Sequence, residues 1–278
     1  MKSRPFGQKS GVETSIIGQG TWNMGRADWK DSVSALRRGV DLGMTHIDTA
    51  EYYGAAENIV GEAIAGRRDE VFLVSKVMPQ NASEKGTVKA CEASLAKLAT
   101  SHLDCYLLHW RGSKPLAETI AGFDRLLEQG KILSFGVSNF DVDDLEEVWA
   151  LSEGRIVCNQ VLYHLEERAI EHGVLPWCAA HGVAVTAYSP FGSGHFPGPA
   201  TPGGQVLARI ASARRATARQ VALAFLTRET AVFAIPKASN AAHAEDNAAA
   251  GSLALSHEDI AALDAAFPKG SRRSLPMI

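Results

Sequence analysis

Cysteine is scarce in this chain of 278 residues, and no two cysteines are close enough to form a CxxC pair. The cysteines lack the density of a disulfide scaffold, so we expect them to be reduced; they are Cys91, Cys105, Cys158 and Cys178. An excess of one charge is also missing, because 28 basic and 31 acidic residues leave a net charge of −3, with no basic stripe. Nucleic acid is therefore not an expected partner.

Long hydrophobic runs are absent too. No apolar run approaches the roughly 18 residues that a membrane-spanning helix needs. The N-terminus, MKSRPFGQKSG, has no apolar segment of the kind that a secretion signal carries. We therefore expect a cytoplasmic protein with no membrane partner, and we expect it to be a monomer. Hydrophobic residues make up 46% of the chain, which is enough for a large core.

One pattern recurs along the chain: a short β-rich run, a polar or glycine-containing loop, and an Ala/Leu-rich amphipathic helix. Apolar residues such as Val33, Leu36 and Val40 have helical spacing. Strands are predicted at 16–20, 45–48, 71–76, 103–109, 133–138, 157–161, 184–188 and 232–235. Helices are predicted at 29–42, 57–65, 87–98, 116–128, 143–151, 174–181, 205–215, 219–228 and 242–250.

This alternation predicts an α/β fold. The strands are short and nearly continuously apolar, which suits a parallel sheet that is covered on both faces. Eight strand–helix units in about 250 residues predict a (β/α)8 TIM barrel, with residues 1–278 as one domain. A doubly wound sheet is the alternative, but the loop after the first strand, GQGTWNMG, lacks the GxGxxG spacing typical of that fold.

Both ends of the chain carry additions to the barrel. The segment 2–15, with GQKSG in its middle, predicts a hairpin that closes the barrel floor. The segment 256–267 predicts an added helix, with Ser256 as its N-cap and Asp259 in its first turn. The tail 268–278 is expected to be irregular.

Polar residues stand at the predicted strand ends, which is where the active site of a barrel lies. Asp48, Lys76 and His109 end or directly follow three consecutive strands, and Tyr53 comes five residues after Asp48. Each alone has an ordinary structural explanation, such as a turn hydrogen bond for Asp48 or a solvated strand edge for Lys76. Together, facing one mouth, they favour a shared polar pocket.

These residue types permit acid catalysis on a carbonyl group. A tyrosine has a pKa near 10, and Lys76 close to Tyr53 is expected to lower that pKa, with burial opposing part of the effect. Asp48 would keep Lys76 charged, and His109 would donate a hydrogen bond to the carbonyl oxygen. Tyr53 would then protonate the oxygen as a hydride reaches the carbon.

Several segments occur in the order typical of aldo-keto reductases: DTAEYYG, LVSKV, LLHW, GVSNF, NQ, AYSPFGSG and IPKASN. The chain resembles this family from about residue 16 to residue 267. The resemblance implies an NAD(P)H-dependent oxidoreductase that reduces aldehydes or ketones to alcohols. It makes Asp48, Tyr53, Lys76 and His109 the catalytic tetrad, with Tyr53 as the acid. Tyr52 falls outside the spacing and is at best a pocket residue.

The resemblance also implies a site for a nicotinamide cofactor. In proteins of this kind Ser138, Asn139 and Gln160 hydrogen-bond the carboxamide, and Tyr188 stacks on the ring. From the residues alone, Asn139 is also explained as the N-cap of the next helix. The segment 189–193 resembles the loop that folds over the pyrophosphate, although by itself it is a turn rich in Pro and Gly.

The segment IPKASNAAHAEDN resembles the part of the family that holds the adenosine phosphate, where Lys237 is expected to meet a 2′-phosphate. Here Ala238 replaces the family's serine, His243 stands where an arginine is common, and Asp246 replaces a glutamate before Asn247. Loss of the arginine weakens phosphate recognition, because imidazole offers less charge and no bidentate geometry. We expect NADP(H) to be preferred, with NAD(H) as an open alternative.

The expected cofactor-binding set therefore runs through most of the strand ends. Its members are Gly20, Thr21, Trp22, Asp48, Ser138, Asn139, Gln160, Tyr188, Ser189, Pro190, Phe191, Gly192, Ser193, Ile235, Pro236, Lys237, Ala238, Ser239, His243 and Asn247.

The substrate, a small-molecule carbonyl compound, is expected beside Tyr53 and His109. Trp22 and Trp110, directly after the first and fourth strands, are expected to form walls of its pocket. The connection after Trp110, RGSKP, is short, as is the C-terminal tail, which favours an open site for small or varied aldehydes.

No metal site is expected, because the ligand-like pairs in the chain supply only two ligands each; these pairs are His102 with Cys105 and Cys178 with His181. Two other functions stay open. One is a non-catalytic, regulatory protein that binds a nicotinamide nucleotide. The other is a barrel lyase or isomerase that uses Lys76 as a Schiff-base nucleophile.

Overall fold

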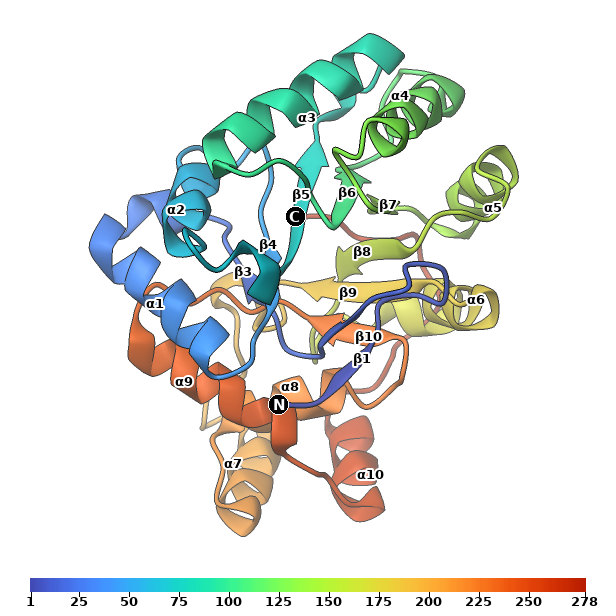
Figure 1. The fold of residues 1–278 in the computed structure, drawn as a ribbon. Helices are drawn as coiled ribbons and strands as arrows, with labels where there is room; N and C mark the ends of the chain where they lie inside the picture. Colours follow the sequence, from blue (N-terminus) through green and yellow to red (C-terminus); the bar gives the residue numbers. More distant parts are fainter.

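Eight parallel strands form a ring in chain order (Figure 1). The structure is a computed structural model that describes residues 1–278. The strands of the ring are β3 (Gln19–Gly20), β4 (His46–Asp48), β5 (Phe72–Val77), β6 (Cys105–Leu108), β7 (Phe135–Ser138), β8 (Cys158–Leu162), β9 (Ala184–Tyr188) and β10 (Val232–Ala234). Parallel bridges from Ile17 to Ala234 and from Gly20 to Lys237 join the first strand to the last, so the ring closes. The predicted (β/α)8 fold is confirmed, and the doubly wound alternative is wrong.

Helices cover the outside of the ring (Figure 1). The α-helices are α1 (Trp29–Asp41), α2 (Ala56–Ala63), α3 (Glu84–Leu98), α4 (Leu116–Glu128), α5 (Val142–Leu151), α6 (Val174–His181), α7 (Pro202–Arg214), α8 (Ala218–Leu226), α9 (Ala241–Ala249) and α10 (His257–Ala266). Short 3₁₀ turns are η1 (Met24–Arg26), η2 (Arg68–Glu70), η3 (Pro79–Asn81), η4 (Ala169–His172), η5 (Gly192–Gly194) and η6 (Ala250–Ser252).

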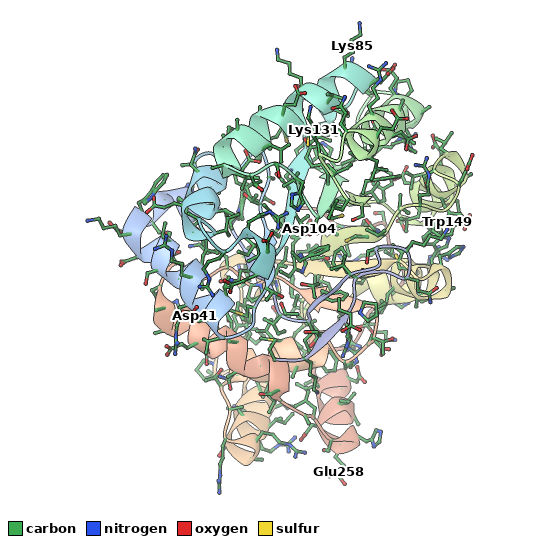
Figure 2. All side chains as sticks on the ribbon, in the orientation of Figure 1. Asp41, Lys85, Asp104, Lys131, Trp149 and Glu258 are labelled. Atoms are coloured by element: carbon green, nitrogen blue, oxygen red, sulfur yellow. The ribbon has the colours of Figure 1, made fainter.

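The helix layer is amphipathic, with its charged side chains toward the solvent. Figure 2 shows Asp41, Lys85 and Glu258 at the periphery of the molecule, and all three are exposed. None of the helices combines the length and the hydrophobicity that crossing a lipid bilayer requires.

Some element ends differ from the prediction for local reasons. Helix α3 begins at Glu84 rather than at 87, because the Ser83 side chain caps it by accepting a hydrogen bond from the amide of Gly86. The first strand is shorter than predicted, since only Gln19 and Gly20 pair continuously with β4. Ser256 caps α10, as predicted, and it also forms a capping box with Asp259.

The predicted hairpin is present and closes one end of the barrel. Strands β1 (Ser3–Pro5) and β2 (Glu13–Ser15) pair in antiparallel fashion. Between them Phe6 is completely buried, with ring centroids 4.6 Å from Phe72, 5.1 Å from Phe233 and 5.2 Å from His46. In Figure 1 this hairpin crosses in front of the ring.

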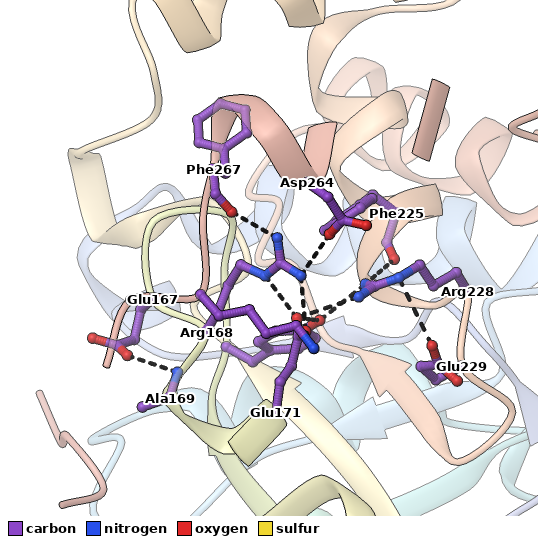
Figure 3. Close-up of polar contacts among 12 residues, drawn as sticks. Glu167, Arg168, Ala169, Glu171, Phe225, Arg228, Glu229, Asp264 and Phe267 are labelled. Carbon is purple, nitrogen blue, oxygen red and sulfur yellow. Dashed lines mark hydrogen bonds and ion pairs between the residues drawn. The ribbon is translucent and has the colours of Figure 1, made fainter. Parts of the chain in front are cut away.

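A network of charged groups holds the end of α10 against the segment after β8 (Figure 3). Arg168 pairs with Glu171 and with Asp264 at 2.7 Å each, and it donates a hydrogen bond to the carbonyl oxygen of Phe267. Beyond this anchor the tail 268–278 has no regular structure, as predicted. It ends near the barrel axis (Figure 1), on the side of the candidate site.

Candidate active site

A cleft of about 1000 Å³ lies at the carboxyl ends of the strands. Three of the four residues predicted for catalysis line it, namely Asp48, Tyr53 and His109. The fourth, Lys76, is completely buried directly behind them. The fold brings these side chains together because the ends of β4, β5 and β6 are neighbours in the ring.

Lys76 is held by two oxygen atoms. Its Nζ lies 2.6 Å from Asp48 Oδ1 and donates to the carbonyl oxygen of Thr49 at 2.7 Å. It also lies 5.0 Å from the ring centroid of Tyr53. Burial lowers the pKa of Lys76, but Asp48 and Tyr53 together raise it more, so the pKa lies above its ordinary value and the ammonium stays charged.

The expected net lowering of the Tyr53 pKa is wrong. Burial raises this pKa above 10.0, the Lys76 charge offsets only part of the effect, and the nearby Asp48 carboxylate adds to the rise. The reason is that a phenolate loses its hydration in this enclosed place. Tyr53 is therefore a protonated phenol at neutral pH, in contact with a fixed cation.

His109 is a neutral imidazole. Burial, together with the smaller effect of the Lys76 charge, lowers its pKa to about 3. Its Nδ1 is buried without a hydrogen-bond partner, whereas Nε2 is not enclosed in this way. Its ring lies 5.6 Å from that of Tyr53, centroid to centroid, so both side chains face the same part of the cleft.

The residues expected around the nicotinamide carboxamide form one hydrogen-bonded group. Gln160 Nε2 donates to Asp48 Oδ2 at 2.7 Å, and Ser138 Oγ donates to the carbonyl oxygen of Gln160 at 2.8 Å. Asn139 donates to the carbonyl oxygen of His109 and accepts from the Tyr188 hydroxyl at 2.9 Å. This group fixes the Tyr188 ring at the edge of the cleft.

Asn139 is not the cap of the following helix. Asp141 caps α5, because its side chain accepts a hydrogen bond from the amide of Val142. Asn139 instead has a φ of +61°, a left-handed conformation that asparagine tolerates better than most residues. The N-cap interpretation of Asn139 is therefore wrong.

Most of the other predicted cofactor residues lie on the cleft. The structure places there Gly20, Thr21, Trp22, Ser189, Pro190, Phe191, Ser193, Ile235 and Lys237. It does not bring the following to the cleft wall: Gly192, Pro236, Ala238, Ser239, His243 and Asn247. His243 lies in the first turn of α9, where its ring contacts the amide of the N-cap Asn240 at 3.1 Å.

Aromatic side chains surround the space in front of Tyr53. Trp22, Tyr52 and Trp110 line the cleft, and the Trp22 ring lies 5.0 Å from Tyr53 and 5.9 Å from Tyr52. Tyr52 is thus a pocket residue. This wall is apolar and uncharged, apart from the catalytic group itself.

Four further residues line the cleft that the sequence did not indicate: Asn23, Gly194, Met277 and Ile278. Asn23 directly follows the predicted Trp22 and Gly194 directly follows Ser193, so extending those segments by one residue would have found them. Met277 and Ile278 have no local signal, because contacts far along the chain fix the tail. Arg273 pairs with Glu167, and the amide of Leu275 donates to Asp141.

These residues fit a nicotinamide dinucleotide. The Tyr188 ring is fixed for stacking, and Gln160 Oε1 has no protein partner and can accept a hydrogen bond. Beyond the end of β10, Lys237 is exposed and forms no ion pair, which suits a phosphate. No group of three or more His, Cys, Asp or Glu side chains is arranged to hold a metal ion.

The comparisons with known proteins agree with this geometry. Residues 16–267 match the family model described as the aldo/keto reductase family. The chain is 47% identical to methylglyoxal reductase YeaE from Escherichia coli over 262 residues, which cover 92% of each chain. It is 30% identical to a glyoxal reductase from Bacillus subtilis over 92% of this chain and 90% of that protein. A solved aldo/keto reductase from Klebsiella pneumoniae, in complex with NADP and acetate, superposes with a TM-score of 0.94 at 43% identity, covering 100% of this chain and 99% of that one.

Proposed function

The chain belongs to the aldo/keto reductase family, and we propose that it acts on small aldehydes, 2-oxoaldehydes included. The reaction is the NAD(P)H-dependent reduction of the carbonyl group. In this proposal Tyr53 is the proton donor. The observation that carries the proposal is the position of Tyr53 on the cleft wall with Lys76 behind it, whose Nζ lies 5.0 Å from the Tyr53 ring centroid and is paired with Asp48. A bound nicotinamide supplies the hydride.

Tyr53 and His109 bind the carbonyl oxygen. The neutral His109 ring carries one N–H, and on Nε2 this group donates a hydrogen bond into the cleft. This bond orients the oxygen toward the Tyr53 hydroxyl. Tyr53 then gives up its proton as negative charge develops on the oxygen, which is general acid catalysis.

Lys76 stabilises the phenolate that Tyr53 leaves behind. The ammonium already lies beside the Tyr53 ring, 5.0 Å from its centroid, and is fixed by Asp48 and by the Thr49 carbonyl, so it need not move during proton transfer. The same arrangement does not support Lys76 as a Schiff-base nucleophile. A buried, protonated amine has no free electron pair to attack a carbonyl.

The preferred cofactor is NADP(H), with NAD(H) as the alternative. Lys237 supports this preference, because an exposed ammonium without an ion-pair partner is available to a 2′-phosphate. The Klebsiella structure contains NADP, which agrees with this assignment. His243 adds little, since its imidazole is engaged by Asn240.

Small aldehydes fit the wall formed by Trp22, Tyr52 and Trp110. This wall offers apolar contact and no charged side chain to select a charged substrate. Methylglyoxal and glyoxal, after which two of the relatives are named, are compact aldehydes of this kind.

The test combines cofactor binding with a proton-donor variant. NADPH and NADH are titrated by quenching of tryptophan fluorescence, and methylglyoxal reduction is followed by nicotinamide absorbance. Tyr53→Phe should lower kcat/KM by roughly 10²–10⁴-fold while leaving the Kd for NADPH nearly unchanged. Tyr52→Phe, which changes a neighbouring exposed tyrosine, should retain most of the activity.

Each contrary result has a distinct meaning. Unchanged turnover in Tyr53→Phe would reject Tyr53 as the acid. Cofactor binding without turnover of any aldehyde would favour the non-catalytic, regulatory alternative.

We also propose that residues 1–278 act as a single domain, as a monomer in the cytoplasm, without a nucleic-acid partner. The hairpin and the tail both pack on the barrel, and the cysteines are free and buried, which supports this proposal. Light scattering coupled to size-exclusion chromatography checks the oligomeric state.

A further inference from the structure

The wall of the cleft contains a single Lys or Arg side chain, that of Lys237. A nicotinamide dinucleotide carries a pyrophosphate, and NADPH carries a further phosphate on the adenosine ribose. One lysine is little charge for so many phosphate oxygens, and His243 does not reach the cleft wall. A further cation without an anionic partner lies next to the cleft.

Arg219, the second residue of α8, is such a cation. Its guanidinium carbon lies 5.1 Å from the ring centroid of Phe196 and 5.7 Å from that of Phe191. Phe191 itself lines the cleft, and the two phenylalanine rings meet edge to face at 5.7 Å. Arg219 is exposed, and its side chain forms no hydrogen bond and no ion pair in the protein.

The other arginines that stack on aromatic rings differ from Arg219 in this respect. Arg155, Arg168 and Arg228 also lie over phenylalanine rings, but each of them pairs with a carboxylate. Arg219 is the one stacked arginine whose N–H donors are all free. Stacking uses the face of the guanidinium and leaves these in-plane donors available to an anion.

Arg219 does not itself line the cleft, but the contacts around it place the start of α8 beside the end of the cleft that contains Lys237. Its neighbours Thr217 and Gln220 both hydrogen-bond Asp246 of α9, with Gln220 Nε2 at 2.8 Å. Helix α9 begins shortly after Lys237, and α8 also packs against β10. Arg219 therefore contacts the segment 189–196 through Phe191 and Phe196, and Lys237 lines the same cleft as Phe191.

We propose that Arg219 binds a phosphate group of the dinucleotide and is the second cation of this end of the site, while its stacking on Phe191 and Phe196 holds the segment 189–196 over the cofactor. This inference rests on the proposed function. It assigns to α8 the charge that is missing from α9, where His243 replaces an arginine. An arginine is suited to this task, because its planar N–H groups match the geometry of phosphate oxygens.

The experiment measures dinucleotide affinity rather than turnover. The Kd values of NADPH and NADH are determined by tryptophan fluorescence, over a range of salt concentrations, for wild type, Arg219→Gln and Arg219→Lys. Arg209→Gln is the matched control, because Arg209 is an exposed arginine without an ion pair on the neighbouring α7. Arg219→Gln should raise Kd about tenfold or more and make its salt dependence shallower, and Arg209→Gln should change neither.

The two dinucleotides separate the two phosphate sources. An equal loss of affinity for NADPH and NADH places Arg219 on the pyrophosphate, and a loss for NADPH alone places it on the 2′-phosphate. Arg219→Lys should fall between wild type and Arg219→Gln, since it keeps the charge but not the stacked plane.

Two results would overturn the inference. One is unchanged affinity in Arg219→Gln. The other is a loss of affinity with unchanged salt dependence, which would reduce Arg219 to a packing residue of the segment 189–196. If wild type binds neither dinucleotide, the proposed function fails instead, so the two failures are distinguishable.

Discussion

The charge of Lys76 determines what the other three members of the catalytic group can do. Asp48 and Thr49 hold the ammonium in place, so Tyr53 and His109 both face a permanent cation in a poorly hydrated site. The same cation lowers the pKa of His109 and opposes the rise in the pKa of Tyr53. As a result, Tyr53 keeps its proton and His109 remains neutral, which is what the proposed roles of acid and hydrogen-bond donor require.

A second histidine lies in a purely structural place. His46 is completely buried on the barrel floor against Phe6 and Phe72, and neither of its ring nitrogens has a hydrogen-bond partner. Burial, together with the smaller effect of the Lys76 charge, lowers its pKa to about 3. The folded protein therefore holds His46 neutral over a pH range in which the unfolded chain protonates it.

This histidine makes stability pH-dependent. Below pH 6.5, the ordinary value for histidine, the unfolded state binds a proton that the folded state does not. The free energy of unfolding should therefore fall as the pH drops from 6.5 toward about 3, by up to about 1.4 kcal/mol per pH unit for His46. His46→Phe should remove this contribution, as measured by urea denaturation at neutral and at mildly acidic pH.

The control for His46 is an exposed histidine. His257, the first residue of α10, is exposed, and His257→Gln should leave the pH dependence as in wild type. The pKa of His109 is also lowered, and this residue is present in wild type, in His46→Phe and in His257→Gln, so its contribution is the same in all three. An equally steep loss of stability in His46→Phe would show that His46 is not a source of the effect.

At the scale of elements, Glu171 joins segments that are distant in the sequence (Figure 3). It accepts from Tyr163 at 2.6 Å and from Arg168 at 2.7 Å, and Arg228 lies 3.3 Å away. These contacts link η4 to the end of α8 and, through Arg168, to the end of α10. They lower the pKa of Glu171 to about 2, despite burial.

Neutralising this carboxylate should loosen the three elements. The stability that Glu171 contributes is present above pH 4.5 and is lost as the pH falls through about 2, because the unfolded chain takes up the proton first. Glu171→Gln should therefore lower the free energy of unfolding at neutral pH by about 3 kcal/mol. It should also make the free energy of unfolding depend less on pH below 4.5.

Glu229→Gln is the matched control for Glu171. Glu229 also faces Arg228, but at 3.8 Å and with 56% of its side chain exposed. Its loss should change stability by less than about 1 kcal/mol. If chemical denaturation gave the same small loss in the free energy of unfolding for both variants, the buried network would have no special stabilising role.

At the scale of the whole molecule, the hairpin that stabilises the fold and the cleft lie at opposite ends of the barrel. The hairpin seals one end through Phe6, and the cleft lies at the other end, beyond the last residues of the strands. Because no residue of the cleft wall belongs to the hairpin, changes at the floor should alter stability without altering the site.

Phe6→Ala tests this separation. It removes a completely buried ring and should destabilise the protein by about 3–5 kcal/mol. The kcat/KM of the remaining folded enzyme should stay close to that of wild type. Leu133→Ala, which truncates a side chain that is 53% exposed, serves as the control with little effect on stability. A large change in kcat/KM for Phe6→Ala would mean that the floor and the site are coupled.

Much of the architecture could be predicted because it depends on local patterns. The alternation of apolar runs and amphipathic segments predicted all eight strands of the barrel, the helices around it and the hairpin. Asp48, Lys76 and His109 could be placed at one mouth, because parallel neighbouring strands end at the same edge. The predicted boundaries of single elements were less accurate. The start of α3, for example, lies about one turn earlier than predicted, because Ser83 caps the helix there.

The sequence by itself determined which residues form the barrel and that Asp48, Lys76 and His109 meet at neighbouring strand ends. Only the tertiary structure decided the direction of the Tyr53 pKa shift, the role of Asn139 as a link between His109 and Tyr188, and the arrival of Met277 and Ile278 in the cleft. The physical reason is the distance along the chain between the groups that interact. Helix and strand periodicity depend on neighbouring residues, whereas desolvation and long-range hydrogen bonds sum over groups that meet only after the ring has closed.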